Sequence, residues 1–322
     1  MMVEISRTNG RARANFIALG VGAVAAAVGL LPWLTSGMRL PAQNLWASQD
    51  LPGDMPFALL PFSQYYFLVL FGMIVLPGGI IGVVMRRYRR DEPEARRFTP
   101  LLAAVALMAI QITALIQAAR VTAAGLRHIP AAQTYTGAID AAIVACIVIG
   151  VAIALVIALG TPGLATVAAA GAAVALGYWI AAFPLTDFTT FLKVQRLARA
   201  FSTTGEWAPG VATGIALAWY GWRPGKRFIG TWAGTLAVLW VGKAIVDGLF
   251  GMVSNRVDLG SFNRMAENGF QVFKLSLKSG LIALAVAAAI GAAGCIYGLY
   301  RAATPGTLAL KPDARPTTDA KG

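Results

Sequence analysis

The sequence has few of the residues that build metal centres, disulfides or nucleophilic active sites. Its 322 residues include one histidine and two cysteines, and only 13% of them are charged. Cys146 and Cys295 both fall within apolar runs, where a thiol behaves as a small hydrophobic group, and their spacing matches no zinc or redox motif. His128 stands alone in a predicted loop. We therefore expect no disulfide, no metal site and no cofactor.

Catalytic motifs are also missing. The sequence contains no HExxH, GxSxG, Walker A or CxxC pattern. Acidic side chains in the predicted outer loops could serve glycosyl transfer from a lipid-linked sugar, but such residues are ordinary in loops, so we expect no enzyme activity. These acids are Asp50, Asp54, Asp187, Asp258 and Glu267.

Apolar residues, in contrast, are abundant. They make up 57% of the chain, and the mean hydropathy of +0.67 is far above that of ordinary soluble domains. The formal net charge is +13, but the basic residues form short clusters between apolar runs instead of one polar face. Such clusters are typical of membrane topology signals and not of a nucleic-acid surface. We expect an integral membrane protein that contacts membrane lipids and no nucleic acid.

The apolar runs predict an all-α, polytopic bundle of about eight transmembrane spans, because ~20 apolar residues in a helix cross a bilayer core ~30 Å thick. The sixth run is cleanly apolar only from Gly210 to Trp222, so seven spans and a half-span are the alternative. Short amphipathic helices are expected in the outer loops, at 185–202 and 270–278, although the second pattern also fits a strand. The predicted spans are 15–34, 62–85, 99–119, 138–160, 164–183, 208–222, 229–252 and 279–300.

The basic clusters predict the orientation. By the positive-inside rule, the cytoplasmic segments are the more basic ones, at 7–13, 86–97, 223–227 and 301–321. Both termini then lie in the cytoplasm, and the Ala-, Gly- and Arg-rich composition favours a bacterial cytoplasmic membrane. The first apolar run is long for a signal peptide and many more follow, so we expect an uncleaved span. Residues 1–14 form a basic tail, and the polar, Pro-rich segment 303–322 is predicted to be disordered.

The second half of the chain resembles the first. The segments PGGIIG at 77–82 and PGVATG at 209–214 are similar at an offset of 132 positions, and two further pairs of segments follow in the same order at offsets of 130 and 143. This favours a parallel duplication, with four spans in 15–160 and four in 161–302. Chance similarity is the alternative, because the chain has 35 glycines and 16 prolines.

Two predicted spans carry a Pro-Gly step in matching positions, namely Pro77-Gly78 and Pro209-Gly210. Proline removes a helix hydrogen bond, and interrupted helices in corresponding positions of two halves point to a substrate pathway in many transporters. The alternative is packing, because small residues four apart allow membrane helices to approach closely. We take these four residues as candidates for lining a path.

Charged residues within a span are rare here, and Lys243 and Asp247 are an exception. Residues four apart share a helix face, so their side chains are expected to pair. Ionisable groups inside spans commonly mark ion, proton or substrate paths, while a tilted helix with Asp247 at the interface is the alternative. Gln111 and Gln117 are further candidates, first as amides that join helices and second as path-lining groups.

These features together favour a transporter or permease that moves a small solute or lipid-related molecule. A non-catalytic subunit or assembly protein of a larger membrane complex is the alternative, with other membrane proteins or a second copy as partners. A polar cavity that reaches Lys243 would favour transport, and a solid bundle with a flat apolar face would favour a subunit.

Overall fold

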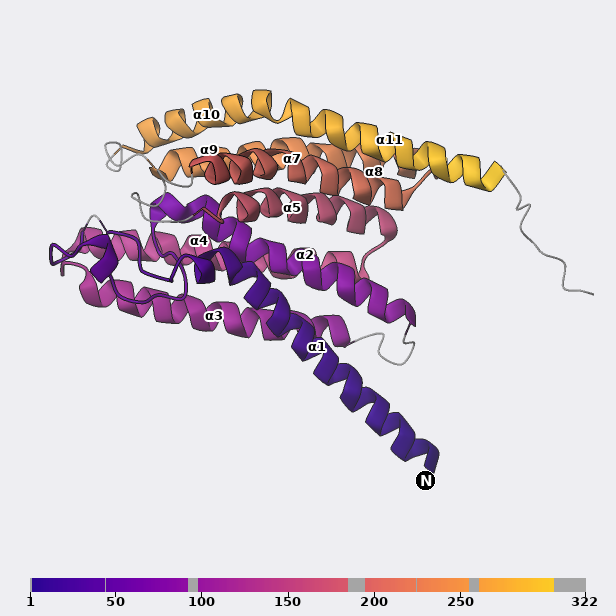
Figure 1. The fold of residues 1–322 in the computed structure, drawn as a ribbon, viewed down its shortest axis with the longest axis horizontal. Coiled ribbons are helices and arrows are strands. Elements are labelled where there is room, and N and C mark those ends of the chain that lie inside the picture. The colour runs from indigo at the N-terminus through magenta and orange to yellow at the C-terminus, as the bar shows by residue number, and fades with distance from the viewer. Residues whose placement is uncertain are drawn as a thin grey trace, which may run out of the picture.

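The protein is a bundle of long helices in the computed structural model (Figure 1). The structure describes residues 2–43, 45–91, 98–184, 195–223, 225–254 and 261–303, and within these ranges it contains no strand, only two isolated β-bridges. The predicted all-α class is confirmed. The predicted disordered tail lies outside the described residues, except for Ala303.

Seven helical segments in the described ranges are long and apolar enough to cross a membrane, so the chain is an integral, multi-pass membrane protein. The identity of the membrane and the side on which the termini lie stay predictions. The helices are α1 (Met2–Thr35), α2 (Phe67–Asp91), α3 (Thr99–Gly125), α4 (Pro130–Leu159), α5 (Pro162–Ala181), α7 (Gln195–Tyr220), α8 (Lys226–Ala237), α9 (Lys243–Ser254), α10 (Phe262–Ser279) and α11 (Leu281–Ala303), with short helical turns η1 (Pro52–Asp54) and η2 (Gln64–Tyr66) and a π-helix, η4 (Val238–Gly242).

Consecutive long helices run in opposite directions, but they do not pack in chain order, because α1 packs on α3, α2 on α4 and α7 on α11, each pair running in the same direction (Figure 1). Helix α2 packs along α1, α4 and α5, while α7 packs along α5 and α11. Helices α8, η4 and α9 continue one another, and α10 leads into α11 through Gly280. The most buried of the spanning segments is Gln64–Asp91, which contains α2.

The sixth predicted span differs from the observed helix. Helix α7 begins at Gln195, not at position 208, and its 26 residues rise about 39 Å. Its first half is too polar for α7 to be among the seven apolar segments, so an eighth span stays a prediction. Residues 195–202, predicted to lie in a separate surface helix, are the first turns of α7, and 185–194 lie outside the described residues.

The second predicted surface element, 270–278, is helical and lies within α10. Helix α10 packs along α9, where a Cβ atom added to Gly248 would lie 3.1 Å from the carbonyl oxygen of Gly269. Polar residues dominate the exposed side, together with Phe262, Phe270 and Leu275. The amphipathic segment that was predicted as a surface helix is therefore one helix of a hairpin, and its apolar face packs on the other helix, α9.

The connection between α1 and α2 folds back onto the helix ends. Met55, Ala58 and Phe62 are at most 1% exposed, so this loop contributes to the core. The indole nitrogen of Trp33 donates to the Ala58 carbonyl at 2.8 Å. A buried loop needs partners for its peptide groups, since unpaired ones cost free energy in an apolar environment.

Candidate functional site

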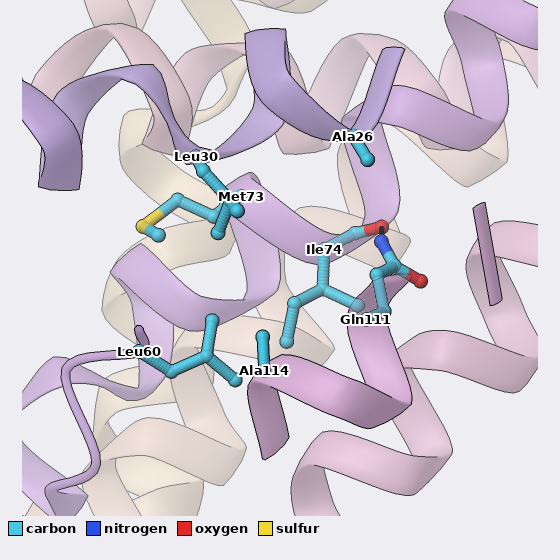
Figure 2. A pocket seen from close by; sticks show the side chains of 7 residues that line it. All are labelled: Ala26, Leu30, Leu60, Met73, Ile74, Gln111 and Ala114. Carbon is cyan, nitrogen blue, oxygen red and sulfur yellow. Dashed lines mark hydrogen bonds between the residues drawn. The ribbon is translucent and has the colours of Figure 1, made fainter. Parts of the chain in front are cut away.

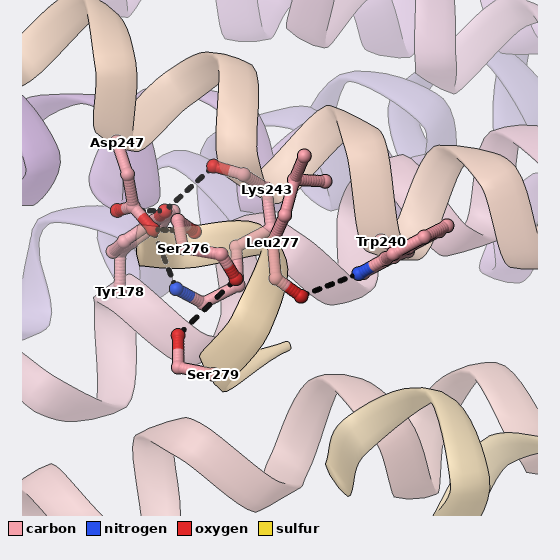
Figure 3. A network of polar contacts seen from close by, with 7 residues as sticks. All are labelled: Tyr178, Trp240, Lys243, Asp247, Ser276, Leu277 and Ser279. Carbon is pink, nitrogen blue, oxygen red and sulfur yellow. Dashed lines mark hydrogen bonds and ion pairs between the residues drawn. The ribbon is translucent and has the colours of Figure 1, made fainter. Parts of the chain in front are cut away.

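The Lys243 and Asp247 side chains form an ion pair, which confirms the predicted pairing (Figure 3). The Lys243 Nζ lies 2.6 Å from Asp247 Oδ2, and the two side chains are 22% and 14% exposed. Both belong to the first two turns of α9. Whether they line a path stays a prediction.

Two further helices bring hydroxyl donors to the same carboxylate (Figure 3). Tyr178 from α5 donates to Asp247 Oδ1 at 2.6 Å, and Ser276 from α10 donates to Oδ2 at 2.5 Å. The Lys243 ammonium also lies 5.7 Å from the centroid of the Tyr178 ring, within cation–π range. Asp247 is therefore an acceptor shared by three helices, and we call Tyr178, Lys243, Asp247 and Ser276 the carboxylate cluster.

The backbone immediately before the cluster is irregular. Val238–Gly242 form a π-helix, which holds more residues per turn than an α-helix and so changes the direction in which the residues after it point. Trp240 within it donates to the Leu277 carbonyl at 2.7 Å. That carbonyl lies in the last turn of α10, where helix carbonyls lack intrahelical partners. The π-helix thus joins α10 to the segment that carries Lys243 and Asp247.

Tyr178 and Ser276 were not predicted as site residues. A signal for Tyr178 existed in the sequence. It lies ~24 Å along α5, near the C-terminal end of that helix. Asp247 lies at a similar depth along the segment of α8 and α9, which runs parallel to α5. Ser276 carried no such signal, since its membrane depth depends on how α10 folds against α9. Helix contacts, not local sequence, bring it to Asp247.

Removing the Tyr178 hydroxyl should weaken the bundle. We expect Tyr178→Phe to lower the free energy of unfolding by about 2 kcal/mol, because a hydrogen bond to a charged group contributes more than a neutral one. Thermal unfolding in detergent, followed by circular dichroism, measures the change. Tyr297→Phe is the matched control, since Tyr297 is 62% exposed on α11. Equal effects of the two substitutions would contradict the role given to Tyr178.

The Pro-Gly step of α2 is tightly packed. Pro77 offers no N–H to the Met73 carbonyl, and Gly29 of α1 lies against both that oxygen and the proline ring. One residue on, Gly78 faces the backbone of Gly150 in α4, so that an added Cβ would lie 2.6 Å from the Gly150 carbonyl carbon. The missing side chains allow α1 and α4 to approach α2 on two sides.

The Pro-Gly step of α7 makes corresponding contacts. Pro209 leaves the Gly205 carbonyl without its N–H, and a Cβ on Gly177 of α5 would lie 2.6 Å from that oxygen and from the proline ring. A Cβ on Gly210 would lie 2.5 Å from the Ala283 carbonyl oxygen in α11. These contacts agree with the packing interpretation and with the predicted duplication. The duplication itself and a path along these helices stay predictions.

Gln111 and Gln117 both join separate segments. Gln111 is buried and donates to the Ile74 carbonyl of α2 at 2.8 Å. It borders a cavity of about 10 Å³, enough for about one water molecule. This cavity is lined by Ala26, Leu30, Leu60, Met73, Ile74, Gln111 and Ala114 (Figure 2).

Gln117 holds the partly buried loop between α1 and α2, because it accepts from the Leu59 N–H at 2.7 Å and donates to the Phe57 carbonyl at 3.1 Å. Gln117→Met should lower the free energy of unfolding by about 2 kcal/mol, since both peptide groups lose their partner. Protease cleavage within 36–63 should also become faster. Gln133→Met, at an exposed position of α4, is the control. Unchanged cleavage in Gln117→Met would contradict this role.

The loop acids do not form a second site in the described residues. Asp50 is exposed and accepts from Ser48 and Trp46, both at 2.7 Å, and these bonds hold the pKa of its carboxyl below the usual value. Asp54 and Glu267 are exposed. Asp187 and Asp258 lie outside the described residues. No group of three His, Cys, Asp or Glu side chains in the described ranges could hold a metal ion.

The carboxylate cluster is accordingly the best-defined polar site of the described chain. Comparison with protein-family models, with curated proteins and with solved structures finds no match, so the interpretation of this site depends on its own geometry.

Proposed function

We propose that this integral membrane protein is a secondary transporter of a small solute and that the carboxylate cluster couples transport to an ion or a proton. The observation that carries the proposal is Asp247, a carboxylate inside a spanning segment that accepts from Lys243, Tyr178 and Ser276 on three helices. Ionisable groups at such depth are costly in a bilayer, and they commonly mark ion or substrate pathways. A π-helix beside such a group is also common at functional sites.

The cluster gives a physical basis for coupling. When Asp247 is charged, it attracts the Lys243 ammonium and the hydroxyls of Tyr178 and Ser276, and so draws α5, α9 and α10 together. Protonation of the carboxylate, or its occupation by a cation, weakens all three interactions at once. Charge on this single group therefore controls how tightly three helices associate, which is the two-state behaviour that alternating access needs.

A flux measurement tests the proposal. Proteoliposomes that enclose a pH-sensitive, a sodium-sensitive or a potassium-sensitive dye would be exposed to the corresponding ion gradient and to a panel of amino acids, sugars and organic cations. We expect at least one solute to cause ion or proton movement with the wild type, none with Asp247→Asn, and wild-type movement with Asp91→Asn, whose carboxylate is exposed. Equal flux in wild type and Asp247→Asn, or none for any solute, would contradict the proposal.

A subunit of a larger membrane complex is the second candidate. It is favoured by an apolar stripe on α7, in which four large side chains follow one another at intervals of four residues and are 39–58% exposed. Neither the small cavity beside Gln111 nor an apolar groove between α8 and α11 is lined by Lys243 or Asp247. The mass of the particle extracted in mild detergent distinguishes the two, since a subunit would carry stoichiometric partner chains. The stripe consists of Trp207, Val211, Ile215 and Trp219.

A further inference from the structure

An apolar groove lies where α8 begins and α11 ends, near the opposite end of the α8–α9 segment from Asp247. Figure 1 shows these two helix ends at the same end of the bundle. The groove has a volume of about 250 Å³ and is almost wholly apolar. It is lined by Trp222, Phe228, Trp232, Ala292, Cys295, Ile296 and Leu299.

One wall of the groove is a set of interlocked aromatic rings. The Phe228 ring centroid lies 4.8 Å from that of Trp222 and 5.6 Å from that of Trp232. Trp232 also rests on Gly291 of α11, where an added Cβ would lie 3.0 Å from the indole ring. These contacts fix the wall in place, so the groove is formed before anything enters it.

The Trp232 indole nitrogen is a donor without an acceptor in the described part of the chain, and it is buried. Buried indole N–H groups usually find a hydrogen-bond partner, and aromatic residues with one polar group are favoured at the level of lipid headgroups. The Trp232 indole nitrogen is shielded from the groove surface, so Trp232 contributes its apolar ring to the wall.

Basic residues lie close in the chain to residues that line the groove. Lys226 and Arg227 begin α8, and Arg301 lies in the last turn of α11. All three are exposed, and none forms an ion pair within the described ranges. Neither α8 nor α11 contains an acidic residue. This basic region is thus complementary to an anion.

We propose that this groove binds one acyl chain of an anionic phospholipid. Lys226 and Arg227 bind the phosphate, as basic residues at the ends of spans bind anionic headgroups. Trp232 lies about 8 Å deeper along α8 than Arg227, on the acyl side of the headgroup, where its ring borders the acyl chain. The apolar wall of the groove then contacts the acyl chain of the lipid. Lipid already surrounds this part of the protein in the membrane. This site does not depend on the proposed transport function.

Native mass spectrometry of the delipidated full-length protein tests the site. The protein would be titrated with phosphatidylglycerol and with phosphatidylcholine of identical acyl chains. We expect one phosphatidylglycerol to bind at a concentration about tenfold lower than phosphatidylcholine does, because phosphatidylglycerol carries a net negative charge, whereas the choline cation of phosphatidylcholine repels the two basic residues. The double variant Lys226→Gln/Arg227→Gln should lose most of this preference, whereas Arg87→Gln, at an exposed position of α2, should keep it.

Filling the groove supplies an independent test. Ala292→Phe should abolish the tight binding of phosphatidylglycerol. If Ala292→Phe does not fold, Ile296→Trp replaces it as the filled variant, because Ile296 is 67% exposed. The proposal is wrong if the wild type binds both lipids equally or if a folded, filled variant still binds phosphatidylglycerol tightly. It is also wrong if binding occurs only after residues 304–322 are removed, because the tail is then the occupant.

Discussion

Gly78→Ala should lower the free energy of unfolding by about 3 kcal/mol, because the new methyl group meets backbone that cannot rotate away. Its Cβ would lie 2.6 Å from the Gly150 carbonyl carbon and closer still to the oxygen, so α2 and α4 must separate. Overpacking of a flexible side chain would cost less. Unfolding in a denaturing detergent, followed by tryptophan fluorescence, gives the free energy difference.

The control for this substitution is Gly137→Ala on α4, where an added Cβ meets nothing within 4 Å. Alanine is the better helix former, so this variant should be as stable as the wild type or more stable by up to about 1 kcal/mol. Gly210→Ala should behave like Gly78→Ala, because its Cβ would lie 2.5 Å from the Ala283 carbonyl oxygen. If Gly78→Ala is as stable as Gly137→Ala, the close packing of α2 on α4 is wrong.

The helices could be predicted from the sequence because hydrophobic length decides them. Unpaired peptide groups are too costly in hydrocarbon for any structure but a helix across each long apolar run. The helix that contains most of the sixth predicted span is longer than its apolar run. Its first turns, from Gln195, are polar, and only packing on α5 and α11 shows that the helix continues through them.

The carboxylate cluster was predicted only in part. The ion pair is local, since residues four apart on a helix necessarily share a face. Tyr178 and Ser276 lie 69 and 29 positions from Asp247 in the sequence. Their approach depends on helix packing and on the π-helix before Lys243, and no spacing rule in the sequence encodes either.

Asp247→Ala should lower the free energy of unfolding by about 3 kcal/mol. The substitution leaves the Lys243 ammonium, whose side chain is 22% exposed, without its counterion, and removal of one partner from a pair shielded from water is strongly destabilising. It also leaves two hydroxyl donors without their acceptor. Thermal unfolding of Asp247→Ala, Lys243→Ala and the double variant forms a double-mutant cycle, which separates the pair from its surroundings.

The chain supplies a matched control pair in Arg87 and Asp91. These residues also lie four apart with the cation first, but their side chains are 74% and 58% exposed and their closest atoms are 3.4 Å apart. Breaking such a surface pair should cost at most about 0.5 kcal/mol. A similar cost at both pairs would mean that water screens Lys243 and Asp247 as well as it screens the surface pair. A large coupling energy at Lys243 and Asp247 alone would show that this charge pair lies where water screens it little. Placing charges in such a region of a membrane costs free energy, and a functional role explains why the bundle retains them.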